Sequence, residues 1–148
     1  MEWTLEVIVV PVSDIDRART FYADRCGFTV DHDTRIDGGV RIIQLTPPGS
    51  PCSIVIGSGL TPAPGQTTMT PGAIQGLQLC VPDIEAAHDE LLERGVGVSA
   101  VQHVGPSGWE PGKGEPWNSF VFFTDPDGNG WVVQESPAPL AERGPPAE

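Results

Sequence analysis

Histidines are the side chains of this sequence best suited to proton transfer. His103 follows an apolar stretch and precedes a loop rich in Gly, Pro and Trp. Because an imidazole can exchange a proton near neutral pH, His103 is the first choice for a general base. His88 stands among helix-type residues, and His32 stands between Asp31 and Asp33. We expect both on the surface, although the two carboxylates beside His32 could also form a cation site.

The loop from Gly105 to Trp117 is the most informative irregular stretch. It carries Trp109 and Trp117, although large apolar rings are normally buried. The rings are expected either to pack at a sheet edge or a subunit interface, or to stack on a flat organic ligand. Glu110 and Glu115 beside them would suit a cationic aromatic ligand, through charge attraction and cation–π contact.

Two further candidates for ligand contact lie inside predicted strands. Phe120, Phe122 and Phe123 share the stretch 118–124. Because successive side chains of a strand point to opposite faces, at least one of them, taken as Phe122, is expected to point into the ligand cavity. Gln44 is an amide in an apolar strand and lies either at a sheet edge or inside a ligand cavity.

Other catalytic arrangements are missing from the sequence. No Ser-His-Asp or Cys-His order indicates nucleophilic catalysis, and no glycine pattern of the Walker or Rossmann type occurs. Cys26, Cys52 and Cys80 are widely spaced and form no CxxC motif. A disulfide framework and a zinc knuckle are therefore disfavoured, and each cysteine is expected to be reduced and buried.

Length and charge narrow the class of partner. The 148 residues suit one domain or two small modules that share a core. A formal net charge of −12 disfavours nucleic acid and anionic membranes as partners. No apolar run approaches the ~20 residues of a membrane span, and the start lacks the pattern of a signal peptide. We expect a cytoplasmic protein.

The elements that must position these side chains occur twice. Asp14 and Asp83 each follow a strand rich in Val, Ile or Leu and precede apolar residues at helical spacing. A short carboxylate can accept hydrogen bonds from the free N–H groups of a helix start, so each Asp predicts a helix N-terminus. Gly27 and Gly95 predict the helix ends.

Strand-like stretches complete two β-α-β-β-β modules. One strand precedes each helix and three follow it, at 5–12, 28–32, 40–46 and 52–57, and again at 77–81, 97–103, 118–124 and 130–135. The modules are expected at residues 1–58 and 73–135, with a linker rich in Pro, Gly and Thr at 59–72 and a disordered tail at 136–148. Trp3 and Trp131 lie in strands and are expected in the core.

This duplicated pattern, followed by the turn Asp125-Pro126-Asp127-Gly128-Asn129, resembles the vicinal oxygen chelate superfamily of glyoxalases, bleomycin-resistance proteins and extradiol dioxygenases. The resemblance covers about Leu5 to Glu135. It implies an α+β fold of two tandem β-α-β-β-β modules whose curved mixed sheet encloses a cup. It also implies a homodimer, in which a second subunit completes the sheets or the ligand groove.

The resemblance also points to four positions where metal-using relatives hold a divalent cation. They lie seven residues before each helix-start Asp and four residues after each turn glycine, at Val7, Ser53, Gly76 and Val132. Val and Gly have no side-chain donor, and Ser is a poor ligand for a divalent metal. We therefore expect no metal and no other cofactor. A shift of one residue would offer Glu6 and Gln75, but on the opposite strand face.

The leading hypothesis is a metal-independent protein similar to the bleomycin-resistance branch. It would bind a small organic molecule, aromatic or cationic, in the cup or the dimer groove through Gln44, Trp109, Trp117 and Phe122. The alternative is an enzyme of the same fold, either a lyase, isomerase or cyclase with His103 or an acidic residue as base, or a metal-dependent lyase or dioxygenase if the ligand register is shifted. A third reading is a dimeric interaction module.

Overall fold

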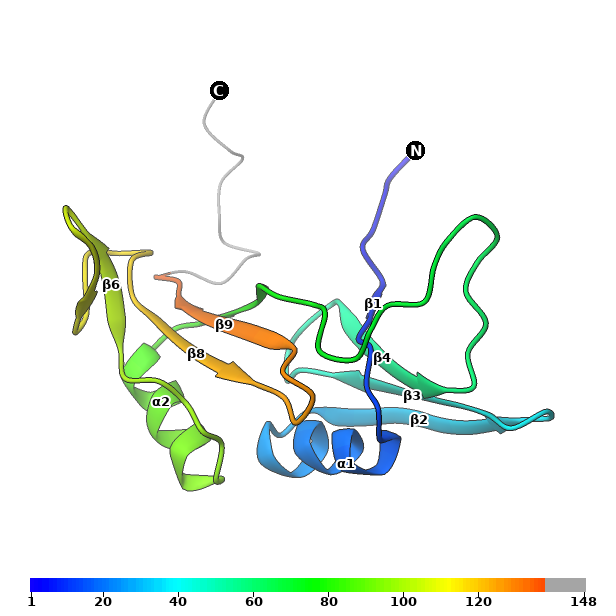
Figure 1. Cartoon of the computed structure of the whole chain (residues 1–148). Helices are drawn as coiled ribbons and strands as arrows, with labels where there is room; N and C mark the ends of the chain where they lie inside the picture. The colour runs from blue at the N-terminus through cyan, green and yellow to red at the C-terminus, as the bar shows by residue number, and fades with distance from the viewer. Residues whose placement is uncertain (138–148) are drawn as a thin grey trace. The chain divides into compact units, whose positions relative to one another are not determined.

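The computed structural model describes residues 1–137, so the tail expected at 136–148 lies outside the described residues except for its first two positions. Figure 1 shows the elements, which run in the order β1 Val7–Val9, α1 Ile15–Thr20, the π-helical turn Phe21–Arg25, β2 Thr29–Ile36, β3 Val40–Thr46, β4 Ser53–Ser58, β5 Leu77–Val81, α2 Ile84–Glu93, β6 Gln102–Gly105, β7 Gly108–Pro111, β8 Phe120–Thr124 and β9 Gly130–Glu135. The chain divides into two compact units. The first is Met1–Gln75 with Thr124–Gly130, and the second is Gly76–Phe123 with the chain from Trp131.

The first unit holds a four-stranded sheet in the order β1-β4-β3-β2, in which β1 runs parallel to β4. Residues of β3 alternate between the two faces. Arg41, Ile43 and Leu45 are buried, whereas Val40, Ile42, Gln44 and Thr46 are partly exposed. The buried face packs against α1, as Figure 1 shows. The residues of the other face, here called the open face of the first sheet, are partly exposed.

The first helix begins as the sequence predicts. The carboxylate of Asp14 accepts a hydrogen bond of 3.0 Å from the backbone N–H of Arg17, which confirms the N-cap. After Thr20, the helix widens to a π-helical turn, because the N–H of Cys26 donates to the carbonyl of Phe21. This wide turn keeps the consecutive rings of Phe21 and Tyr22 both buried.

The second unit holds a five-stranded sheet in the order β5-β9-β8-β6-β7, with β5 parallel to β9. Asp83 caps α2 by accepting a hydrogen bond of 3.0 Å from the N–H of Ala86. Phe123 and Trp131 stack with their ring centroids 6.0 Å apart and are buried. The prediction that Trp131 lies in the core is confirmed.

Several predicted element bounds are wrong. The first strand is three residues long instead of spanning 5–12, because Pro11 has no N–H to continue the ladder and β4 begins only at Ser53. Trp3, expected in the core, is 89% exposed because it lies beyond the end of that pairing. The sixth strand begins at Gln102 and forms a hairpin with β7, inside the loop expected to be irregular.

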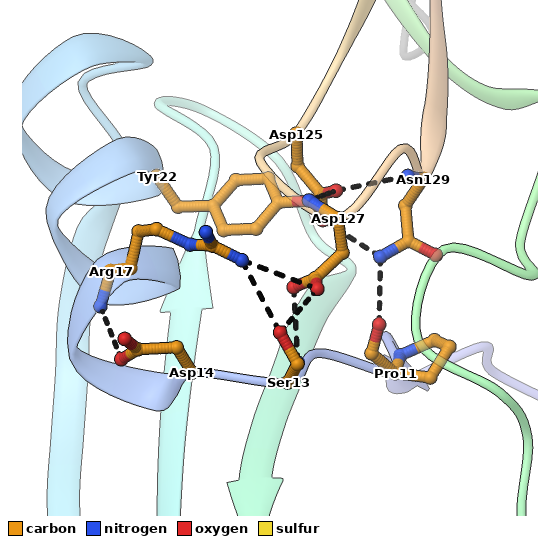
Figure 2. Close-up of polar contacts among 8 residues, drawn as sticks. All are labelled: Pro11, Ser13, Asp14, Arg17, Tyr22, Asp125, Asp127 and Asn129. Carbon is orange, nitrogen blue, oxygen red and sulfur yellow. Dashed lines mark hydrogen bonds and ion pairs between the residues drawn. The ribbon is translucent and has the colours of Figure 1, made fainter.

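The turn Asp125–Asn129 belongs to the first unit, although its flanking strands belong to the second. Figure 2 shows its contacts. The buried carboxylate of Asp125 accepts hydrogen bonds from the hydroxyl of Tyr22 at 2.7 Å and from the amide of Asn129 at 2.8 Å. Asn129, fully buried, also donates to the carbonyl of Pro11 at 2.8 Å. Asp127 accepts from the N–H of Ser13 at 3.0 Å. Every carboxylate and amide of this turn therefore has partners within the unit.

The cysteines and helices bear on two further expectations. Cys26 and Cys52 are half-buried thiols, but Cys80 is an exposed thiol, so the prediction of a buried side chain is wrong there. Cys80 alternates with core residues on β5 and points to the other face. Among residues 1–137, no helix has the length and apolar character that crossing a membrane requires.

Candidate functional site

A row of hydrogen-bonded polar side chains crosses the open face of the first sheet. Nε2 of His32 lies 3.3 Å from Oε1 of Gln44, whose Nε2 donates to Oγ of Ser53 at 3.4 Å. The hydroxyl oxygens of Ser53 and Thr46 lie 2.6 Å apart, and Thr46 also donates to Asp31. These five residues, here called the polar row, come from β2, β3 and β4. The strand register brings them together, since His32 lies opposite Gln44.

A cavity of about 590 Å³ lies in the first unit between the end of β1 and the segment Gly59–Pro71. Its apolar lining includes Val9, Leu60 and Met69, which are each at least 40% exposed. Its polar lining consists of Ser, Thr and Gln side chains, with no charged residue. The volume falls within the range of about 300–1,000 Å³ that is typical of small-molecule sites.

Three aromatic rings form a cluster on one face of the second sheet. Trp109 makes edge-to-face contacts with Phe120, at 5.3 Å between centroids, and with Phe122, at 5.1 Å. Strand register places Gln102 opposite Phe120, and Val104 opposite Trp109, so all three rings lie on one face. This face is opposite the buried Val121 and Phe123 and is called here the open face of the second sheet. The Trp109 side is accessible because the residue is 52% exposed.

A chain of amide groups lies on the same open face. Gln78 Nε2 donates to Oε1 of Gln134 at 2.6 Å, and Gln134 Nε2 donates to the carbonyl of Trp117 at 2.7 Å. Gln134 alternates with the buried Val133 on β9, so it shares the face of the aromatic cluster. Trp117 has a φ of +71°, which is rare for a bulky residue and stores strain of the kind found at functional sites. Together, the rings and amides offer apolar contact beside hydrogen-bonding groups.

His103 lies on the other face of β6. Its register partner is Glu110, while the neighbouring pair is Val104 and Trp109. Nε2 of His103 lies 3.3 Å from Oε2 of Glu110, and Nδ1 lies 2.9 Å from the carbonyl oxygen of Gly112. Both ring nitrogens thus already face acceptor oxygens. Glu110, expected to support a cationic ligand at Trp109, is instead directed at His103.

The structure brings only part of the expected site together. Trp109 and Phe122 are in direct contact, and Trp117 joins their face through its carbonyl group. Gln44 lies in the other unit, within the polar row. Sequence reasoning missed Gln78 and Gln134 and the connection of Gln44 to His32 and Ser53, and among the phenylalanines it selected Phe122 without Phe120. The alternation in Leu77-Gln78-Leu79-Cys80-Val81 was the available signal for Gln78.

The four positions expected to hold a metal in relatives do not supply a suitable donor set. Val7 and Ser53 are register partners, but Val132 lies opposite Gln78, and Gly76 precedes β5. Ser53 is the only one of the four with a side-chain donor atom, and its hydroxyl already bonds to Gln44 and Thr46. No group of three or more His, Cys, Asp or Glu suited to a metal ion occurs among residues 1–137. These side chains do not fit a divalent cation.

The strongest charge interactions lie on the helix-covered face of the first sheet. The guanidinium of Arg41 donates to both carboxylate oxygens of Asp33, at 2.9 and 2.8 Å, and to Asp16 at 2.6 Å. The hydrogen bonds and charge of Arg41 lower the pKa of Asp33, while the same contacts raise the pKa of Arg41. This cluster joins the sheet to α1 and serves the fold.

Comparison with known proteins adds independent findings. The family model of the Glyoxalase/Bleomycin resistance protein/Dioxygenase superfamily matches residues 4–133. The solved structure of TnmS3, an antibiotic binding protein from Streptomyces sp. CB03234, is 32% identical, with a TM-score of 0.68, and the match covers 91% of this chain and 97% of that chain.

Two further solved structures are similar over their full length. A glyoxalase/bleomycin resistance protein from Streptomyces sp. CB03234 is 34% identical, with a TM-score of 0.65 and coverage of 88% of this chain and 99% of that chain. A superfamily member from Sphaerobacter thermophilus DSM 20745 is 28% identical, with a TM-score of 0.68 and coverage of 91% and 98%. A search of the curated proteins found no match.

Proposed function

The chain belongs to the Glyoxalase/Bleomycin resistance protein/Dioxygenase superfamily, and on this premise we propose that it binds a small aromatic molecule without using a metal. The observation that carries the proposal is the aromatic cluster of the exposed Trp109 and the half-buried Phe120 and Phe122, beside the amides of Gln78 and Gln134. Binding of this kind requires shape, stacking and a few polar contacts, and no chemical step.

Aromatic rings left open to solvent suit a flat ligand. Trp109 is fixed by edge contacts with two phenylalanines, so stacking on its ring loses little conformational entropy. The amides of Gln78 and Gln134 would hydrogen-bond polar groups on the ligand rim. Because the carboxylate of Glu110 faces His103, it is not directed at Trp109, and we propose an aromatic ligand over a purely cationic one.

Two findings support binding without a metal. The four positions that would hold a cation offer only one hydroxyl donor, which is engaged by its neighbours. TnmS3, similar over nearly the whole chain, is described as an antibiotic binding protein, which fits binding in place of catalysis. Elemental analysis that found one divalent cation per chain would contradict this part of the proposal.

We also propose Gln44, together with His32 and Ser53 of the polar row, as ligand-contacting groups of the first unit by itself. A homodimer in the cytoplasm is proposed on the resemblance described above. The organisation into modules at 1–58 and 73–135 joined by a linker at 59–72 is retained on the same basis.

The direct test is a titration followed by tryptophan fluorescence. Polycyclic aromatic natural products, each with a cationic and a neutral analogue, are added to the wild-type protein and to Trp109→Phe. We expect quenching by an aromatic compound in the wild type and a much smaller signal in Trp109→Phe. Leu92→Ala, which changes an exposed apolar residue of α2, is the matched control and should bind as the wild type does. Quenching that is unchanged in Trp109→Phe would overturn this site.

A further inference from the structure

The polar row of the first sheet is built around a β-bulge in β2. This strand advances two residues, from Val30 to His32, where β3 advances only one, so Asp31 is an extra residue without a register partner. Asp31 and His32 therefore both reach the polar row, although consecutive residues of a regular strand point to opposite faces. Bulges that redirect a side chain in this way are frequent next to functional sites.

The carboxylate of Asp31 sets the direction of the hydrogen bonds in the row. An ionised carboxylate only accepts, so the hydroxyl of Thr46 donates to Asp31. Because its hydrogen is used there, Thr46 accepts from the hydroxyl of Ser53, 2.6 Å away. Ser53 then has no hydrogen left for Gln44, so it accepts from the amide Nε2 at 3.4 Å. The amide oxygen of Gln44 is thereby turned towards His32.

This direction fixes which ring nitrogen of His32 carries the hydrogen. Oε1 of Gln44 only accepts, so the nitrogen 3.3 Å away, Nε2 of His32, is the donor. A neutral imidazole has a single N–H, which leaves Nδ1 as an acceptor. Among residues 1–137, no hydrogen bond to this Nδ1 is found, and His32 is exposed. The end of the row opposite Asp31 is therefore an acceptor that is open to solvent.

We propose that Nδ1 of His32 accepts a hydrogen bond from a hydroxyl group of the ligand, so that the first unit selects an aromatic alcohol over its ether. The second N–H of the Gln44 amide has no partner within residues 1–137 and is the remaining side-chain donor of the row. A hydroxyl can bond to either group, whereas an ammonium ion only donates and an ether only accepts. The aromatic nature of the ligand rests on the proposed function, and the choice of a hydroxyl rests on the polar row.

The first test compares naphthol with its methyl ether at about pH 8, where an unperturbed imidazole is neutral. Affinity is measured by NMR from the side-chain amide resonances of Gln44, which report on the row in every variant. We expect naphthol to bind the wild type about 5- to 15-fold more tightly than the ether, the equivalent of one hydrogen bond. His32→Phe should remove this preference, and His88→Phe, in the second unit, is the matched control that should keep it. Equal binding of the two probes by the wild type, no response of Gln44 to naphthol, or a preference that persists in His32→Phe would overturn the proposal.

Trp109→Phe distinguishes a failure here from a failure of the aromatic cluster. The substitution changes the second unit, so the preference for naphthol measured at Gln44 should equal that of the wild type. Unchanged fluorescence quenching in Trp109→Phe would refute the aromatic cluster and leave recognition by His32 standing. Loss of the preference at Gln44 in Trp109→Phe would instead overturn the assignment of the hydroxyl to His32.

The second test reads the position of the hydrogen on His32 without any ligand, from proton–nitrogen NMR correlations of the ring. Thr46→Val ends the chain at Ser53, whose hydroxyl can then donate to Gln44 and allow the amide to turn. We expect the hydrogen on Nε2 alone in the wild type and on both nitrogens, in exchange, in Thr46→Val. Thr34→Val, the same change at an exposed position of β2 outside the row, is the matched control and should match the wild type. Hydrogen on Nδ1 in the wild type, or an unchanged distribution in Thr46→Val, would contradict the proposed direction.

Discussion

The hydroxyl of Tyr22 donates a hydrogen bond of 2.7 Å to Oδ2 of Asp125, and both side chains are buried. The two residues lie 103 positions apart, and Figure 2 shows how the turn carrying Asp125 meets the helix that carries Tyr22. The same carboxylate accepts from the backbone N–H groups of Asp127 and Asn129, each at 2.9 Å. One carboxylate, which accepts hydrogen bonds from several donors, therefore attaches the turn to the first unit.

Tyr22→Phe should lower the free energy of unfolding by about 1.5–3 kcal/mol, the usual contribution of a hydrogen bond to a charged group. The ring contacts with Phe21 and Phe28 would remain. Urea unfolding followed by circular dichroism measures the change. A double-mutant cycle with Asp125→Asn separates the pair from its surroundings. Additive effects of the two substitutions would show that this hydrogen bond does not couple them.

Acid should destabilise the first unit through Asp33. Hydrogen bonds and charge from Arg41 hold the pKa of Asp33 below its usual 3.8, so ionisation of this carboxylate favours the folded state. Its contribution is complete above that value and is lost as the pH falls through the lower pKa of the folded protein. We expect a smaller loss of Tm in Asp33→Asn than in the wild type below about pH 4. Asp37→Asn, an exposed turn residue, should keep the wild-type slope, and equal slopes in all three proteins would refute the assignment.

The fold could be predicted from the sequence because its signals are local. Asp14 and Asp83 cap helices by bonding to residues three positions ahead, and strand composition repeats in both modules. Element ends were less predictable where pairing between distant segments decides them. Trp3 is an example, because it lies beyond the point where the first strand pairs with β4. The attachment of the Asp125–Asn129 turn to the first unit depends on Tyr22 and Pro11, contacts across more than 100 residues that no local pattern encodes.

The sequence predicted which residue types form the candidate site better than it predicted the sheet face on which each side chain lies. Trp109 and Phe122 were selected as large rings in an exposed loop and a strand, and they are in contact. The sequence offered His103 as a base and Trp109 as a ligand contact, but the β6–β7 register puts His103 opposite Glu110, on the other face. A hairpin inside a loop rich in Gly and Pro sets this register. Because the sequence did not predict β7, the faces to which its side chains point could not be assigned.

His103→Ala discriminates between binding and catalysis. The alternative of an enzyme has His103 as its first choice of base, and the two ring nitrogens of His103 face Glu110 and the carbonyl of Gly112. We expect the variant to bind an aromatic compound from the fluorescence panel within about twofold of the wild type, since the ring lies on the other face from Trp109. Incubation of that compound with wild type, followed by mass spectrometry, should return it unchanged. A product formed by the wild type and absent with a folded His103→Ala would favour the enzyme.

Gln134→Leu should separate polar from apolar recognition at the aromatic cluster. The substitution removes the bonds from Gln134 to Gln78 and to the carbonyl of Trp117 while keeping a similar side-chain volume. A ligand that hydrogen-bonds to these amides should lose about 5- to 15-fold in affinity, the equivalent of one net hydrogen bond. An analogue with its polar rim groups removed should bind both proteins equally, because its contacts with Trp109 and Phe122 are untouched. Glu93→Leu, at an exposed position of α2, is the control and should bind both compounds as the wild type does. Equal loss for both compounds in Gln134→Leu would mean that the substitution disturbs the aromatic cluster itself, and the amide chain would then have no role in selecting the ligand.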